Sequence, residues 1–66
     1  MKRKKLVKYL EKNGCAFIRE GGCHSLYLNL SNSKSSTIPR HPDIKENLCR
    51  KICKDLGIPD ILKPLI

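Results

Sequence analysis

A histidine that directly follows a glycine pair is the residue of this chain best suited to chemistry. The stretch GGCHSLYLN, residues 21–29, places His24 at the start of an alternating run that predicts a strand. Because glycine has no side chain, backbone N–H groups near Gly21 and Gly22 can approach a phosphate closely. Histidine exchanges protons near neutral pH. The spacing alone favours a histidine that only completes the core edge, and the alternative is a proton-transfer group beside a bound phosphate, which the neighbouring residues support.

Cationic side chains are expected around this histidine. Arg19 lies on the strand predicted to pair with that of His24, and Arg40 and His41 follow the third predicted strand. Cleavage of an RNA phosphodiester needs a base, an acid and positive charge against the phosphorane. His24 and His41 could share the two proton roles. Alternatively, the run at residues 39–42 only shapes the approach to the second helix.

Size and charge narrow the classes of function. The chain has 66 residues and a net charge of +8, from 14 Lys plus Arg against 6 Asp plus Glu. A domain this small has a thin core, so function is expected on a surface or in a shallow cleft. The charge favours a polyanionic partner, nucleic acid above all, and is compatible with an acidic protein; solubility alone is the plainer explanation.

The cysteines and the N-terminus bear on the compartment. The start MKRKK is followed by residues too charged for a signal-peptide core, and no run is long enough to span a membrane, so we expect a cytoplasmic protein. A disulfide framework is therefore not expected. The four cysteines are interpreted as small apolar core residues, with a composite zinc site as the alternative: Cys15, Cys23, Cys49 and Cys53.

Hydrophobic periodicity and turn signals predict an α+β fold in the order α-β-β-β-α, with a three-stranded antiparallel sheet covered on one face by two helices. The expected elements are residues 3–13, 15–20, 24–30, 36–38 and 44–56. Asn13-Gly14 and Gly57 are expected to end the helices, and Asp43 to cap the second one.

The second predicted strand has two faces of different composition. Alternation places His24 in one row with Leu26, Leu28 and Leu30, and the apolar character of that row predicts that it faces the helices. His24 would then be a half-buried residue at the rim. The other row is expected on the open face of the sheet and consists of Ser25, Tyr27 and Asn29.

Three stretches in this order resemble the HicA toxin family, also described as YcfA-like. KLVKYLEKNG is similar to its first helix, FIREGGCHSLYLN to its hairpin with a glycine, a small residue and a histidine, and STIPRHPDIKENLCRKICKDLGI to its third strand and second helix. The resemblance covers residues 3–58. We expect one HicA-like domain over residues 1–58, followed by a C-terminal tail at residues 59–66.

The resemblance implies a fold like a double-stranded-RNA-binding domain and the activity of an mRNA interferase. Such a protein is a metal-independent endoribonuclease and the toxin of a type II toxin–antitoxin pair, with mRNA as substrate and no cofactor. Its partner is a HicB-like antitoxin that covers the active surface. The family's catalytic histidine falls on His24. The residue before it is commonly Ser in the family and is Cys23 here, a poorer hydrogen-bond donor.

Together these considerations define a set of expected site residues. His24 is expected to be catalytic, and His41 and Tyr27 are auxiliary candidates. The candidates for RNA binding are Arg19, Gly21, Gly22, Cys23, Lys34, Arg40, Lys2, Lys4 and Lys5. No residue is assigned to a metal. The competing hypothesis is a non-catalytic RNA-binding module, because a fold alone does not fix a function.

Overall fold

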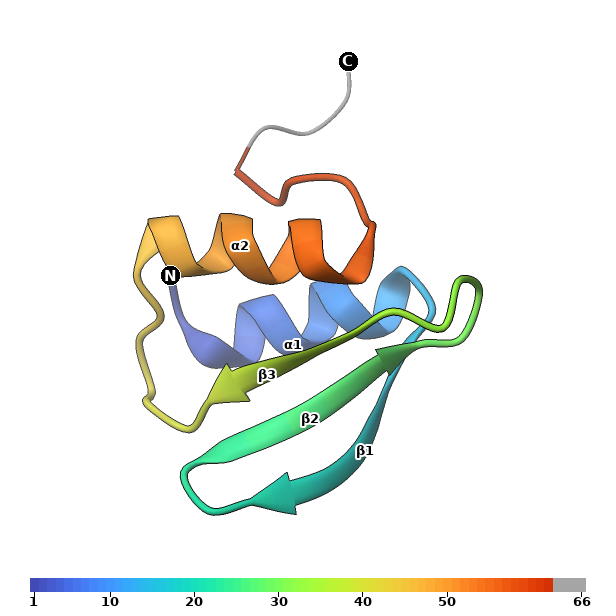
Figure 1. Cartoon of the computed structure of the whole chain (residues 1–66). Helices are drawn as coiled ribbons and strands as arrows, with labels where there is room; N and C mark the ends of the chain where they lie inside the picture. Colours follow the sequence, from blue (N-terminus) through green and yellow to red (C-terminus); the bar gives the residue numbers. More distant parts are fainter. Residues whose placement is uncertain (63–66) are drawn as a thin grey trace.

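The computed structural model describes residues 1–62 and has the predicted α+β order. One antiparallel sheet has the strand order β1-β2-β3, and both helices lie on the same side of it (Figure 1). The elements are α1 (Arg3–Lys12), β1 (Cys15–Gly21), β2 (His24–Asn29), β3 (Ser35–Pro39) and α2 (Glu46–Leu56). None of the described helices is long and apolar enough to cross a membrane.

The core forms between the two helices and the sheet face that they cover. Leu6 and Leu10 of α1 and Ile52 of α2 are fully or almost fully buried there, as the helical spacing of these residues predicts. Ile38 of β3 is the matching apolar residue from the sheet and is also fully buried. The helices and the sheet therefore share one apolar layer, which fixes the position of each strand end.

Glycines end both helices as expected. Gly14, directly after α1, has φ +83°, and Gly57, the C-cap of α2, has φ +68°. The backbone N–H of Ile58 donates to the carbonyl of Cys53, so the chain turns back at the end of α2. A left-handed residue at this position is the usual way to satisfy the last carbonyls of a helix.

The predicted orientation of β2 is wrong. Ser25, Tyr27 and Asn29 are the buried residues of the strand, whereas Leu26 and Leu28 are only half-buried on the open face. His24 belongs to the open-face row and is exposed. Apolar character was a poor guide because the two buried polar side chains Ser25 and Asn29 are hydrogen-bonded, which removes most of the cost of their burial.

The predicted cap of α2 is also wrong. The helix begins at Glu46, its N-cap is Lys45, and no side chain makes a capping hydrogen bond. Asp43 instead forms an isolated antiparallel bridge with Lys2, and the N–H of Ile44 donates to the carbonyl of Met1 over 2.8 Å. Pairing with the N-terminal residues keeps Asp43 and Ile44 extended, so the helix starts later than the sequence suggests.

The predicted C-terminal tail is described only in part. Ile61 and Leu62 are half-buried and pack against the core, together with Ile58. The remainder of the tail, residues 63–66, lies outside the described part of the chain.

Candidate functional site at the hairpin end of the sheet

The backbone holds His24 on both sides while its side chain is exposed. His24 pairs with Gly21 of β1 and with Pro39 of β3, so it is the end of the central strand. Gly22, in the turn between β1 and β2, has φ +61°, a conformation that glycine adopts without strain. The imidazole is therefore presented to solvent from a position that two neighbouring strands fix.

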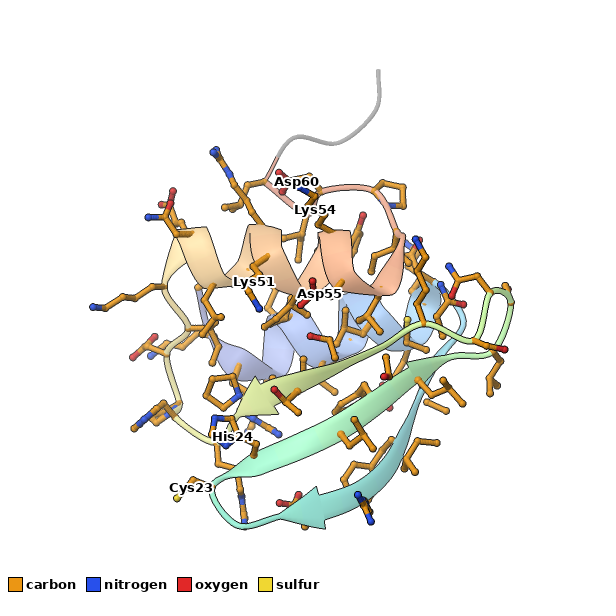
Figure 2. The ribbon with its side chains drawn as sticks, viewed as in Figure 1. Cys23, His24, Lys51, Lys54, Asp55 and Asp60 are labelled. Carbon is orange, nitrogen blue, oxygen red and sulfur yellow. The ribbon has the colours of Figure 1, made fainter. Side chains whose placement is uncertain are left out.

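A small hollow lies at Cys23, the residue that precedes this histidine. The N–H of Arg40 donates to the carbonyl of Cys23 over 3.1 Å, which draws the segment after β3 against the hairpin. Gly22, Cys23, Arg40 and His41 line the hollow, whose volume is about 450 Å³. Figure 2 shows Cys23 and His24 at the hairpin end of the sheet, with the Cys23 side chain directed away from the ribbon. A guanidinium, an imidazole and the backbone of a glycine turn are groups that can bind an anion. We call this hollow the turn hollow.

A hydrogen-bonded network beneath the hairpin fixes this geometry. The Arg3 guanidinium donates to the carbonyl of Pro39 and to Oγ of Ser25, each over 2.9 Å. Ser25 Oγ donates in turn to a carboxylate oxygen of Glu20 over 2.8 Å, and the other oxygen of Glu20 lies 3.5 Å from Arg40. Arg3 therefore ties the start of α1 to all three strands at the end that carries His24.

Two further hollows continue from the turn hollow along the chain. His41 lines both the turn hollow and a second one of about 480 Å³, which also includes Leu48 of α2. Pro42 lines this second hollow and a third one of about 640 Å³. Because each hollow shares a lining residue with the next, His41 or Pro42, the three follow one another along the linker between β3 and α2. We call the second one the linker hollow and the third one the N-terminal hollow.

The N-terminal hollow is lined almost entirely by cations. Besides Pro42, its lining consists of Lys2, Arg3, Lys4, Lys5 and Lys8. The lysines among them are exposed, and Lys2 has an ion pair with Asp43 at 3.5 Å between well-exposed side chains. Exposed ion pairs contribute little, so these ammonium groups can exchange partners readily. The structure thus brings Lys2, Lys4 and Lys5 to the same end of the molecule as His24.

Other residues expected in the site lie elsewhere. Tyr27 is 5% exposed on the helix-covered face, where its ring lies edge-on to Phe17 with centroids 5.8 Å apart. Lys34 lies in the loop between β2 and β3, at the opposite end of the sheet from His24. Arg19 pairs with Leu26, so it lies on the open face, part of the way along the sheet.

The four cysteines do not come together. Cys15, Cys49 and Cys53 are buried in the core, and burial raises the pKa of each of these thiols. Cys23 is exposed at the hairpin. The composite four-thiolate site considered from the sequence is therefore not formed.

Sequence reasoning missed the network that organises this end. Arg3 precedes Leu6 and Leu10 at helical spacing, so it lies on the stripe of α1 that faces the sheet. This spacing could have indicated that the Arg3 side chain points toward the sheet. Ser25 was placed on the open face because of the wrong orientation of β2. Glu20 had no signal of its own, since its role depends on the register that pairs it with Ser25.

The fold and the site define a small α+β domain with an exposed histidine and a cationic path at one end. The family model described as the HicA toxin of bacterial toxin–antitoxin systems matches residues 3–58, and the chain belongs to that family. Comparisons with curated proteins and with solved structures found no match.

Proposed function

We propose that this protein is an endoribonuclease toxin that cleaves mRNA with His24 as general acid or base. The observation that carries the proposal is the placement of His24. Its side chain is exposed and its backbone is held by two strands, beside a hollow lined by Arg40 and His41. A binding module that reads RNA shape through phosphate and 2′-hydroxyl contacts has no need for a proton-transfer group at this position.

The chemistry requires only groups that this end of the molecule carries. His24 takes the proton from the attacking hydroxyl, or gives one to the leaving oxygen, while Arg40 stabilises the charge that develops on the phosphorane. His41 is the neighbouring group for the second proton. Glu20 pairs with Arg40 at 3.5 Å between exposed side chains, so the guanidinium can exchange this carboxylate for a phosphate. Neither proton transfer requires a metal ion.

Membership of the family implies an antitoxin partner. The open face of the sheet is the surface on which we expect this partner to bind. Ile18 and Leu30 are 46% and 67% exposed, and Leu26 and Leu28 are half-buried on the face that also carries His24. Apolar surface of this kind marks protein interaction sites. A HicB-like antitoxin with acidic groups around an apolar centre would cover this face and keep mRNA away from His24 in the cytoplasm.

The test is cleavage of a labelled single-stranded RNA by the purified protein, with EDTA present. We expect the wild type to cut and His24→Ala to cut about 100-fold or more slowly, the usual loss for a general acid or base. Because His24 is exposed, the variant should keep the thermal stability of the wild type. His41→Ala tests the second proton role separately: cleavage by this variant at the wild-type rate would remove His41 from the chemistry and leave the role of His24 intact.

Two results would count against the proposal. Cleavage by His24→Ala at the wild-type rate would remove His24 from the chemistry. Tight RNA binding by the wild type without any cleavage would favour the competing function, an RNA-binding module.

A further inference from the structure

The linker hollow differs from its two neighbours in chemistry. Its inner wall is apolar and comes from two prolines of the linker and two aliphatic side chains: Pro39, Pro42, Ile44 and Leu48. Its remaining lining is polar and consists of His41, Asp43 and Lys45. Ile44 is almost fully buried and Leu48 half-buried, so packing fixes this wall in the free protein. The hollow therefore combines a rigid apolar wall with both a hydrogen-bond acceptor and donors.

Its size and position suit one part of a nucleotide chain. A volume of about 480 Å³ is within the range of small-ligand pockets. It shares His41 with the turn hollow and Pro42 with the N-terminal hollow, so it lies between them along the linker. A strand whose phosphates occupy the two cationic hollows would place a base between them. Single-stranded RNA is read in this way, by stacking of an unstacked base and by hydrogen bonds to its edge.

We propose that the linker hollow is a nucleobase pocket that prefers cytosine to uracil. The inference rests on the proposed RNA substrate and adds a source of sequence preference to it. Cytosine presents an N4 amino group where uracil presents a carbonyl oxygen, and an aspartate accepts from that amino group. Asp43 is the carboxylate of the hollow, and Lys45 is the donor for the ring N3 or O2 of the same base. In uracil the O4 carbonyl oxygen would face the Asp43 carboxylate, and because both groups only accept hydrogen bonds, they would repel each other.

Asp43 is available for this role. It is exposed, and its only ion pair among the described residues, with Lys2 at 3.5 Å, joins two well-exposed side chains. Its part in the fold is the backbone bridge with Lys2, which does not use the carboxylate. Exchange of an ammonium for a base amino group therefore leaves the fold intact. Pro42 and Leu48 of the apolar wall add van der Waals contact that does not depend on base identity.

The test measures binding rather than cleavage, with His24→Ala as the background so that the RNA stays intact. Five-nucleotide oligo(C) and oligo(U) are titrated in the same buffer and salt, and binding is followed by fluorescence anisotropy. We expect oligo(C) to bind about fivefold more tightly, which is the low end of the discrimination that base-edge pairs give. Asp43→Asn should abolish or invert the difference, because an amide can donate to uracil O4.

Glu46→Gln is the matched control. Glu46 is exposed at the start of α2 and does not line the hollow. Its substitution by Gln therefore removes the same charge from the same region as Asp43→Asn does. It should raise the affinity for both oligonucleotides alike and leave their ratio unchanged. A second pair of variants tests the donor. Lys45 is the N-cap of α2 and lines the hollow, whereas Lys54 is exposed in the last turn of α2 and does not, so only Lys45→Ala should change the ratio of the two affinities.

The outcomes are distinct from those of the proposed function. Equal binding of the two oligonucleotides, or a preference that Asp43→Asn leaves unchanged, would overturn the pocket even if the wild type cleaves RNA. A preference that disappears in Asp43→Asn and persists in Glu46→Gln would support the pocket even if the wild type does not cleave. Loss of catalysis and loss of base reading are thus measured separately.

Discussion

The two ends of the sheet both carry polar and basic residues, yet they use them differently. At the loop end, Asn29 and Asn32 both donate to the carbonyl of Leu56, at 2.8 and 3.1 Å, and Lys34 lies against Gly57. At the hairpin end, His24, Arg40 and His41 are exposed at or beside the turn hollow, although Arg3 and Ser25 beneath them form a hydrogen-bonded network. The amides at the loop end satisfy the backbone of α2, while these three side chains at the hairpin end face solvent. Residue type alone does not separate a structural end from a functional one.

The largest effect on stability is expected from Arg3, the residue that ties the hairpin end together. Arg3→Ala removes two charge-assisted hydrogen bonds and leaves buried Ser25 with one partner fewer, so we expect a loss of about 3 kcal/mol in the free energy of unfolding. Urea denaturation measures it. Lys4→Ala removes the same charge from an exposed position and should cost less than about 0.5 kcal/mol. Equal losses in the two variants would show that the network is not what stabilises this end.

At the loop end, Asn29→Ala should cost less. The substitution removes a buried amide that donates to Leu56 and accepts from the N–H of Ser31, but Asn32 still donates to the same carbonyl. We therefore expect a loss of about 1 to 2 kcal/mol in the free energy of unfolding. The RNA affinity of the same variant should fall only in proportion to the fraction of protein that is unfolded. A larger loss of affinity would indicate that RNA binds at the loop end instead of the hairpin end.

A pair of cation variants compares the two ends directly. Arg40→Ala should weaken RNA binding about fivefold and lower the salt dependence by the contribution of about one phosphate contact. Lys34→Ala, at the loop end, removes the same charge and should change affinity less than about twofold, since only long-range attraction is lost. The measurement is anisotropy titration at several salt concentrations. Equal effects would mean that binding follows net charge and not a site.

The smallest effect concerns the thiols, which differ between core and hairpin. Burial raises the pKa of Cys15, Cys49 and Cys53 above the ordinary value of 9.0. Below that pH both folded and unfolded states keep these protons, and stability is unaffected. Above it the unfolded state releases them first, so the free energy of unfolding should fall as pH rises. Cys49→Ala should show a shallower fall in urea denaturation between pH 8 and pH 10; an unchanged slope would contradict the assignment.

The reactivity of the thiols toward a modifying reagent also distinguishes the cysteines of the core from the cysteine of the hairpin. Cys23 is the exposed cysteine at the hairpin end, whereas the other three are buried. A thiol reagent added to the native protein at pH 8 should modify Cys23 rapidly, and the others only as the protein unfolds.

The sequence was sufficient for the order of elements because helical stripes, turn glycines and the alternating strand are local signals. Gly14 and Gly57 end the helices as the pattern indicates. The sequence was not sufficient to predict which face of β2 is buried. Alternation separates two rows, but which row is buried depends on partners distant in the chain, such as Arg3 for Ser25 and Leu56 for Asn29.

The same limit applies to the candidate site. His24 and the glycine turn are contiguous in sequence, so their local pattern could be recognised. The position of the N-terminal lysines beside the linker was not predictable, because it depends on pairing between Lys2 and Asp43. Lys34 lies in the loop after β2, which antiparallel order alone places at the opposite end from the hairpin, so its exclusion from the site was predictable. Tyr27 is excluded by the buried face of β2, which depends on partners distant in the chain.

In the proposed function, RNA binds at the hairpin end of the sheet, along the turn, the linker and the start of α1. NMR chemical-shift mapping of the His24→Ala protein with a short single-stranded RNA locates the bound strand. We expect shifts in the backbone signals of residues 2–8, 21–25 and 40–48. Shifts confined to the loop end, residues 30–35 and Gly57, would contradict the proposal.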